Sequence, residues 1–372
     1  MKGRIKGVAI EPFPAIHHHH LIPLSNPTIT AMPALGTTIG FEVEVVVMCA
    51  REHILRINRH AYDHSIGTAR ELTRLATGDL ICRLLKNSVQ VSCVNNMVRG
   101  IVFEPVYDEW SLEGDSSIRI PAPEGPVETV AGLPVAVEII SRILRPNRAC
   151  SDEVFKVLSC IKSQFTMTTN RTTGLHIHVG NGDEGFPLAT LKKFSMLVVA
   201  FERLINSLHP PERLTSRWCN PPSRSAAFAD EPEMSLRMLG IEQCRTQVDL
   251  VDLMNPSSGR DCAYNFTNLL LGVGKGPKLT IEFRQHAGSV DPHAIMSWAK
   301  FVVALVEYSH EVSESQQFIF CVKKSQDQSY TIFDLMTTVG RGDLVEFYQG
   351  KTFDHETLDH GNSEAAEWRG FF

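Results

Sequence analysis

Four short segments, far apart in the chain, alternate between apolar and polar residues. They span residues 41–45, 135–139, 175–179 and 279–286. Successive side chains of a β-strand point to opposite faces of its sheet, so a period of two predicts a strand with one apolar and one polar face. We therefore expect these segments to form a sheet whose apolar face is buried against the core.

The polar positions of these segments hold mostly Glu, His and Arg, whereas a solvated face typically favours Thr, Ser, Lys and mixed charges. These positions hold Glu42, Glu44, Glu138, His176, His178, Thr280, Glu282, Arg284 and His286. Residues two apart on a strand lie only about 7 Å from each other, so Glu42 and Glu44 would repel unless a cation lay between them. If the strands converge, uncompensated carboxylates raise one another's pKa and destabilise the fold.

Divalent cations would remove this repulsion. Carboxylate oxygens outnumber imidazole nitrogens, and such a set of donors suits Mg²⁺ or Mn²⁺ better than Zn²⁺. Arg284 shares the face of Glu282, and a guanidinium is well shaped to bind phosphate. Together these groups are the ones that phosphoryl transfer requires, so the spacing favours a site for metal and nucleotide. A solvated sheet face and a redundant hydrogen-bond network are the two other interpretations of the same spacing.

Amphipathic helices are expected between and after the strands. Residues 188–208 and 295–306 each carry an apolar stripe with helical spacing, and Asp291-Pro292 is a typical helix start. A sheet rich in strands and backed by helices on one face predicts an α+β fold.

The first 35 residues contain several prolines and little periodicity, so we expect an irregular lead-in over 1–35 and a single catalytic domain over 36–372. The run His17 to His20 favours a tail or tag-like remnant, because the ligands of a metal site are usually separated so that they converge. The stretch 210–232 is rich in proline and is a candidate lid.

Charge and cysteine content argue against several classes of protein. The formal net charge is −6 without any block of five like charges, which disfavours a nucleic-acid-binding arm. The nine cysteines are scattered and never spaced CxxC, which disfavours a zinc ribbon or disulfide scaffold and fits a reducing compartment. No apolar run approaches the roughly 20 residues that span a membrane, and no signal-peptide pattern is evident. We expect a cytoplasmic protein without nucleic-acid or membrane partners.

Taken together and in order, these segments resemble the carboxylate–amine ligases of the glutamine synthetase and γ-glutamylcysteine synthetase type. The chain is similar in particular to an amidoligase family of fungi and bacteria. The matching segments are GFEVE at 40–44, Trp110 with Asp115-Ser116-Ser117, VEIIS at 137–141, TTGLHIHVG at 172–180, Tyr264 with Asn268-Leu269, and TIEFRQH at 280–286. Each motif alone is common, but their order over residues 40–286 is specific. Arg142 departs from the pattern, because the family often has proline there.

The resemblance implies a curved, mainly antiparallel sheet of the glutamine synthetase catalytic-domain type, whose polar face forms the active-site cleft. It implies an ATP-dependent ligase that makes an amide through an acyl phosphate, with two or more ions of Mg²⁺ or Mn²⁺. Its substrates would be a carboxylate and an amine, as small molecules or peptides.

The resemblance also implies a role for each matching residue. Glu44 and Glu138, with Asp115, would hold the metal nearer the acid. Glu42, His176 and Glu282 would hold the metal that bridges the ATP phosphates. His178 would line the nucleotide pocket, together with His176, and Arg284 would stabilise the transferring phosphoryl group. Glu44, Glu282 and Arg284 are thus the expected catalytic residues.

Alternatives stay open at several positions and for the function itself. Asp115 before two serines is also typical of a turn. Asn268 and His286 are either substrate contacts or structural hydrogen-bonding groups, and Arg171 is either a phosphate contact or simply exposed. Tyr264 is more typical of a core. Alternative functions are transfer of phosphate to a guanidino group, metal-dependent hydrolysis without nucleotide, and non-catalytic binding on the same scaffold.

Overall fold

The computed structural model describes residues 33–50, 69–97, 107–120, 132–256, 259–270 and 278–353. Residues 1–32, which make up most of the predicted lead-in and include the histidine run, lie outside the described residues. The extent of the single domain over 36–372 stays a prediction.

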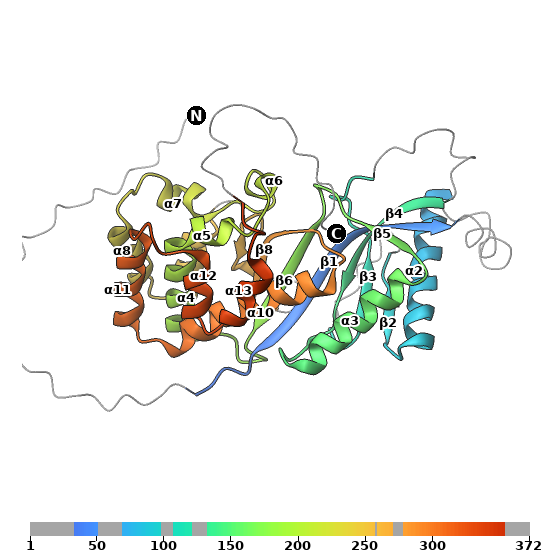
Figure 1. Ribbon diagram of the computed structural model, residues 1–372, viewed down its shortest axis with the longest axis horizontal. Coiled ribbons are helices and arrows are strands. Elements are labelled where there is room, and N and C mark those ends of the chain that lie inside the picture. The colour runs from blue at the N-terminus through green and yellow to red at the C-terminus, as the bar shows by residue number, and fades with distance from the viewer. Residues whose placement is uncertain are drawn as a thin grey trace, which may run out of the picture. The chain divides into compact units, whose positions relative to one another are not determined.

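The described strands form one open sheet with the order β2-β3-β4-β1-β6-β8-β7, and the short β5 pairs with one part of β1 (Figure 1). Every pair of neighbours is antiparallel except β2 and β3, which are parallel. The four predicted segments lie in β1, β4, β6 and β8, which are adjacent in the sheet. The strands are β1 (Thr38–Ala50), β2 (Cys93–Asn95), β3 (Trp110–Glu113), β4 (Gly132–Ile140), β5 (Thr166–Thr168), β6 (Gly174–Gly180), β7 (Tyr264–Asn265) and β8 (Thr280–Ala287).

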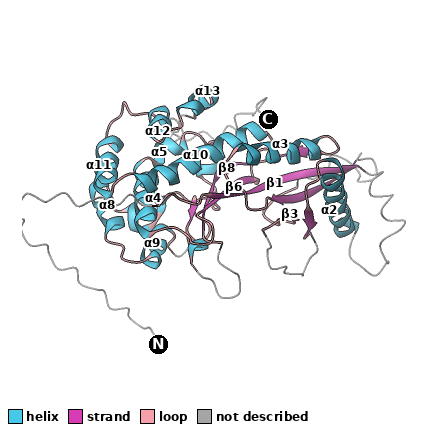
Figure 2. Ribbon diagram, turned by 90° about the horizontal axis from the view of Figure 1, so that it is seen from below, coloured by secondary structure: helices cyan, strands magenta, loops and turns pink. Residues whose placement is uncertain are grey.

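Helices cover the apolar face of this sheet, and Figure 2 shows α3 and α10 on one side of β1 and β6. The α+β expectation of a mainly antiparallel sheet backed by helices is therefore confirmed. None of the described helices has both the length and the apolar character needed to cross a bilayer. The helices are α2 (Ala69–Ser88), α3 (Arg148–Lys162), α4 (Leu188–Ala200), α5 (Glu202–Asn206), α6 (Pro211–Leu214), α7 (Ala226–Ala229), α8 (Met234–Glu242), α9 (Gln247–Met254), α10 (Pro292–Glu311), α11 (Glu314–Ser325), α12 (Ile332–Thr338) and α13 (Val345–Tyr348).

The two predicted helices differ in how well they match. The expected helix over 295–306 lies inside α10, which begins after Asp291; this residue accepts a hydrogen bond from the amide of His293. The expected helix over 188–208 is instead divided at Phe201, whose backbone has left the helical region, so α4 and α5 are separate.

Alternation along β1 separates the core from the polar face. Ile39, Phe41, Val43, Val45 and Val47 belong to the main hydrophobic cluster beneath the helices. Burying each of these side chains stabilises the fold by about 1.5–3 kcal/mol, and a shift of one residue would expose all of them. The core therefore fixes the register that places the intervening glutamates on the opposite face.

A β-bulge interrupts the alternation in β8. One residue of β6, His176, lies opposite two residues of β8, Arg284 and Gln285, and His286 then pairs with Leu175. Leu175 is a core residue, so His286 also lies on the side of the helices, where its ring centroid is 5.8 Å from that of Trp298. The predicted alignment of His286 with Glu282 and Arg284 is wrong for this reason. Burial lowers the pKa of His286 to about 4.

Candidate active site

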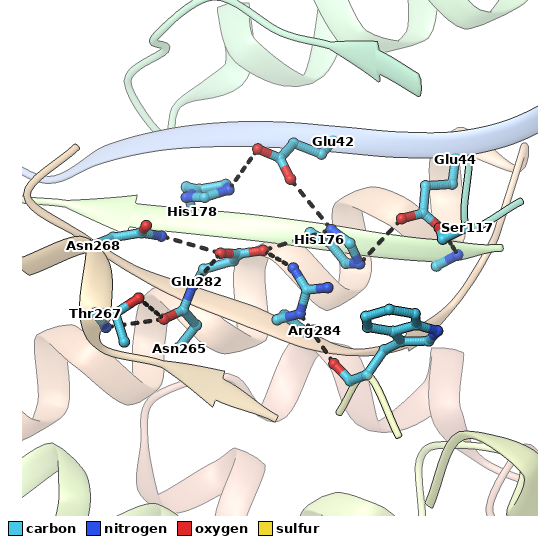
Figure 3. Close-up of polar contacts among 12 residues, drawn as sticks. Glu42, Glu44, Ser117, His176, His178, Asn265, Thr267, Asn268, Glu282 and Arg284 are labelled. Atoms are coloured by element: carbon cyan, nitrogen blue, oxygen red, sulfur yellow. Dashed lines mark hydrogen bonds and ion pairs between the residues drawn. The ribbon is translucent and has the colours of Figure 1, made fainter. Parts of the chain in front are cut away.

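Strand register gathers most of the predicted polar residues on one face of the sheet. Figure 3 shows six of them, which are Glu42, Glu44, His176, His178, Glu282 and Arg284. Glu42 lies opposite His176, Glu44 opposite Glu138, and His178 opposite Glu282. Residues directly opposite each other in an antiparallel pair have Cβ atoms only about 4.5–5.5 Å apart and share a face. The convergence expected from the sequence is thus present in β4, β1, β6 and β8.

One group of possible metal ligands consists of Glu42, His176 and Glu282, all buried. Each offers one ligand atom, and these three atoms lie within 4.8 Å of one another. Nδ1 of His176 is 3.2 Å from Oε2 of Glu42 and 3.6 Å from Oε1 of Glu282. This is the set that the family resemblance implies for the metal nearer the phosphates.

A second group consists of Glu44, Glu138 and His176 and meets the same distance criterion. Here the other ring nitrogen of His176, Nε2, lies 3.5 Å from Oε1 of Glu44. A neutral imidazole has a lone pair on only one of its nitrogens. His176 can therefore coordinate an ion in one group at a time, while the carboxylates remain available in both.

A glycine allows His176 to occupy this position. The amide of Gly174 donates a hydrogen bond of 2.6 Å to Oε2 of Glu44. A Cβ at Gly174 would lie 3.0 Å from Nε2 of His176 and 3.1 Å from Nη2 of Arg213, closer than side chains normally tolerate. The glycine of the GLHIHV segment thus leaves room for the imidazole between the two groups.

Charge in the site fits a bound divalent cation. Burial, and then the nearby charges of Glu42 and Glu44, raise the pKa of Glu138 well above its ordinary value. Burial is also the main reason why the pKa of Glu44 is raised. Carboxylates that resist ionisation in this way would be stabilised in their charged form by a metal, and the oxygen-rich donors suit Mg²⁺ or Mn²⁺.

Glu282 is held by several donors. The Nδ2 atoms of Asn265 and Asn268 donate to its Oε2 at 2.7 and 3.1 Å, and Nη1 of Arg284 contacts its Oε1. Burial acts to raise the pKa of Glu282, but His178 and Arg284 outweigh it, so the pKa is lowered. Nε of Arg284 also donates to the carbonyl of Trp218 at 3.1 Å. Arg284 is therefore fixed in direction by two partners.

Asn268 thus donates a hydrogen bond to Glu282, a candidate metal ligand, which agrees with its interpretation as a hydrogen-bonding group. Asn265 makes the shorter contact but was not predicted, because the Y-x-x-x-N-L motif does not include its position. Tyr264 lies in the core, as expected, with its ring 6.0 Å from that of Phe194. Arg171 is exposed.

His178 and Lys278 meet at one oxygen of Glu42. Nε2 of His178 is 2.9 Å from Oε1 of Glu42, and Nζ of Lys278 donates to the same oxygen at 3.0 Å. Burial alone would raise the pKa of Glu42. The charges of His178 and Lys278 outweigh this effect, so the pKa of Glu42 lies well below its ordinary value. No sequence motif identified Lys278, which lies just before β8.

A cavity of about 350 Å³ opens beside these residues. Glu42, His178 and Lys278 form a polar part of its lining, while Ile140 and Leu279 are among its apolar residues. A pocket with charged groups at one side and apolar groups at another can accommodate a charged ligand with an apolar moiety. The predicted place of His178 in a pocket wall agrees with this geometry.

Asp115 closes a turn beside the second group. Its carboxylate accepts hydrogen bonds from the amide and the hydroxyl of Ser117 at 2.6 and 2.7 Å. It is in neither ligand group of the described residues, although its charge contributes to the raised pKa of Glu44 and Glu138. The turn interpretation is therefore confirmed, and its role as a metal ligand stays a prediction.

Two further arginines support the site from outside it. Arg142, at the position where the family often has proline, donates to both carboxylate oxygens of Glu153 at 2.8 and 2.6 Å, and Glu153 also accepts from Nε1 of Trp110. Arg213 is buried and donates to the carbonyls of Arg284 and Gln285, the two residues of the bulge. Arg213 belongs to the stretch 210–232, where no motif identified it.

The comparisons with known proteins agree with this geometry. A family model described as "Putative amidoligase enzyme" matches residues 36–306, which include all four central strands and both ligand groups. No curated protein matches the chain. The family's name indicates an enzyme that forms amides. Because the match extends over most of the sequence, the chain belongs to this amidoligase family.

Proposed function

We propose that this protein is an ATP- and Mg²⁺-dependent ligase that joins a carboxylate to an amine, on a sheet of the glutamine synthetase catalytic-domain type. The observation that carries the proposal is the pair of ligand groups that share His176, next to a cavity that reaches Glu42 and Lys278. Each group could hold one divalent ion, and two adjacent divalent ions are typical of sites that transfer phosphoryl groups.

In the proposed reaction the γ-phosphoryl group of ATP passes to a carboxylate, giving an acyl phosphate and ADP. An amine then attacks the acyl carbon and inorganic phosphate leaves, so that an amide is formed. The activation is needed because the negative charge of a carboxylate resists attack by an amine. When bound, divalent ions would supply positive charge to the phosphate oxygens.

The position of each residue in the site determines its proposed role. Glu42, His176 and Glu282 would hold the ion nearer the nucleotide, whereas Glu44 and Glu138 would hold the ion nearer the acid. Arg284 would direct its guanidinium at the transferring group, because Glu282 and the carbonyl of Trp218 fix its orientation.

The carboxylate would enter on the side of Glu44 and Glu138, where Asp115 adds a further negative charge and a bound ion would be needed to accept the substrate. Small-molecule and peptide substrates both fit the proposal. The stretch 210–232 is proposed as a cover that keeps water from the acyl phosphate, since it bonds to Arg284 through the carbonyl of Trp218.

The test is to measure ADP, inorganic phosphate and product mass with Mg²⁺-ATP over a panel of acids and amines. A ligase releases phosphate in step with amide formation, and Glu44→Gln and Glu282→Gln should each abolish both. Phosphorylated product without free phosphate would instead identify a phosphotransferase. Turnover of a substrate without any need for ATP would identify a hydrolase and refute the proposal.

A further inference from the structure

Lys278 occupies a place that no motif explains. Its Nζ donates at 3.0 Å to Oε1 of Glu42, a member of the ligand group Glu42, His176 and Glu282. The side chain of Lys278 is 31% exposed, whereas that of Glu42 is 10% exposed. An ammonium that is partly in solvent thus reaches a buried carboxylate from the direction of the cavity, whose wall includes both residues.

A divalent ion held by Glu42 would compete with this ammonium. Both are cations that stabilise the same carboxylate, and two positive charges a few ångströms apart in a poorly solvated site repel each other. Binding of an ion by the first group therefore weakens the contact between Lys278 and Glu42. The ammonium must then find another partner or return to solvent.

Arg284, another cation of the site, cannot respond in this way. Arg284 is held by Glu282 and by the carbonyl of Trp218, and its side chain is only 6% exposed. Lysine, in contrast, has a compact charge on a flexible stem of four carbons. Nζ of Lys278 is also 5.5 Å from the ring centroid of Tyr107, another residue of the cavity wall. The head group therefore has room and an aromatic face on the cavity side.

We propose that Lys278 takes the place of the nucleotide-side metal ion while the site is empty, and turns to the nucleotide phosphates when that ion binds. The inference rests on the proposed function and adds a residue that couples the two ligands. The ion releases Lys278 from Glu42, and the released ammonium meets the anionic ligand in the cavity. Ion and nucleotide each favour the arrangement in which Lys278 has left Glu42, so each strengthens binding of the other.

The test measures binding, without turnover. The affinity for Mn²⁺ is measured by electron paramagnetic resonance without nucleotide, and the affinity for a non-hydrolysable ATP analogue is measured by calorimetry at saturating Mn²⁺. Lys278→Met should bind Mn²⁺ at least about fivefold more tightly and the analogue at least about fivefold more weakly, the lower range of ordinary coupling between sites. Lys278→Gln should show the same pair of shifts, and Lys278→Arg should keep the wild-type affinity for Mn²⁺.

Lys300→Met is the matched control, because it removes the same charge from an exposed position on α10, and it should change neither affinity. A decrease or no change in the Mn²⁺ affinity of both neutral variants would overturn the proposal, since a purely structural lysine produces that result. If the wild-type protein itself binds neither Mn²⁺ nor the analogue, the proposed function fails as well. The two failures are therefore distinguishable.

Discussion

His176 is the residue on which both ligand groups depend. Its Nδ1 faces Glu42 and Glu282, and its Nε2 faces Glu44. The imidazole therefore separates two sets of carboxylates that would otherwise repel across the sheet. Arg284 also connects separate parts of the site. It contacts Glu282 and donates to the carbonyl of Trp218, which lies in a distant segment of the chain.

Replacing Arg284 by lysine tests this link. Lysine keeps the positive charge but loses the planar fork that contacts Glu282 and the carbonyl of Trp218 together. We expect Arg284→Lys to fold normally and to lose at least about 100-fold in kcat, the usual effect of removing one positioned donor. Circular dichroism and steady-state kinetics with Mg²⁺-ATP check this. A variant that changes only the KM for the amine would contradict the assigned position.

The raised pKa of Glu138 predicts how stability depends on pH when no metal is present. A carboxyl group whose pKa is higher in the folded than in the unfolded state binds more protons when folded, so its stabilising effect is lost as the pH rises through the folded pKa. We expect the metal-free protein to lose stability as the pH rises above about 4.3, the ordinary pKa of a Glu side chain, for this reason. Saturating Mg²⁺ should remove the loss.

Urea unfolding at several pH values measures this effect, and Glu138→Gln provides the control. The variant lacks the titrating group, so its free energy of unfolding without metal should depend less on pH than that of the wild type. An equal dependence in both proteins would show that Glu138 ionises freely. Glu42 and Glu282, whose pKa values are shifted in the opposite direction, are present in both proteins, so the comparison reports mainly on Glu138.

At the scale of elements, alternation predicted the four central strands because each has a buried apolar face along several residues. It did not predict β2, β3, β5 and β7, which have only two to four residues and are too short to show a period. His286 was placed on the wrong face because a bulge changes the period within β8, and nothing in the local pattern marks it. The Arg213 contacts with the bulge carbonyls depend on a segment distant in sequence.

The pair of Arg142 and Glu153 joins the end of β4 to α3, and Trp110 attaches β3 to the same carboxylate. The side chains are 41% and 19% exposed, so solvent screens the pair in part. We expect Arg142→Met to lower the free energy of unfolding by about 1 kcal/mol, since the contact is bidentate. A double-mutant cycle with Glu153→Gln measures the coupling. A coupling energy of zero would mean that the pair is not needed to hold the two elements.

At the scale of the molecule, the order of motifs indicated both the family and the residues that converge. The residues that the sequence did not indicate are Asn265, Lys278 and Arg213. Asn265 ends the two-residue strand β7, Lys278 lies just before β8, and Arg213 lies in the four-residue helix α6, so no periodic pattern marks any of them. Strand pairing places Asn265 opposite Glu282, whereas tertiary contacts from outside the strands place Lys278 and Arg213, and local sequence patterns do not specify either kind of contact.

Ligand binding should stabilise the whole protein if the proposed function holds. A ligand at 100 times its Kd, which binds only the folded state, raises the free energy of unfolding by about 2.7 kcal/mol. We expect Mg²⁺ with a non-hydrolysable ATP analogue to raise the Tm more than either alone, and EDTA to reverse the effect. Calorimetric unfolding measures it. A Tm that responds to Mg²⁺ but never to the nucleotide would favour a hydrolase.

Glu42 and Glu44 are both carried by β1, which is hydrogen-bonded to β4 on one side and to β6 on the other. Backbone amides in such a position exchange with deuterium only when a large part of the molecule opens. We expect the β1 amides to be among the slowest in exchange, and those of the edge strand β2 to be much faster. Mass spectrometry of peptides can follow both. Two of the carboxylates that would receive the ions are thus attached to a strand that is paired on both sides, so fraying at the margins of the sheet would leave the spacing between Glu42 and Glu44 intact.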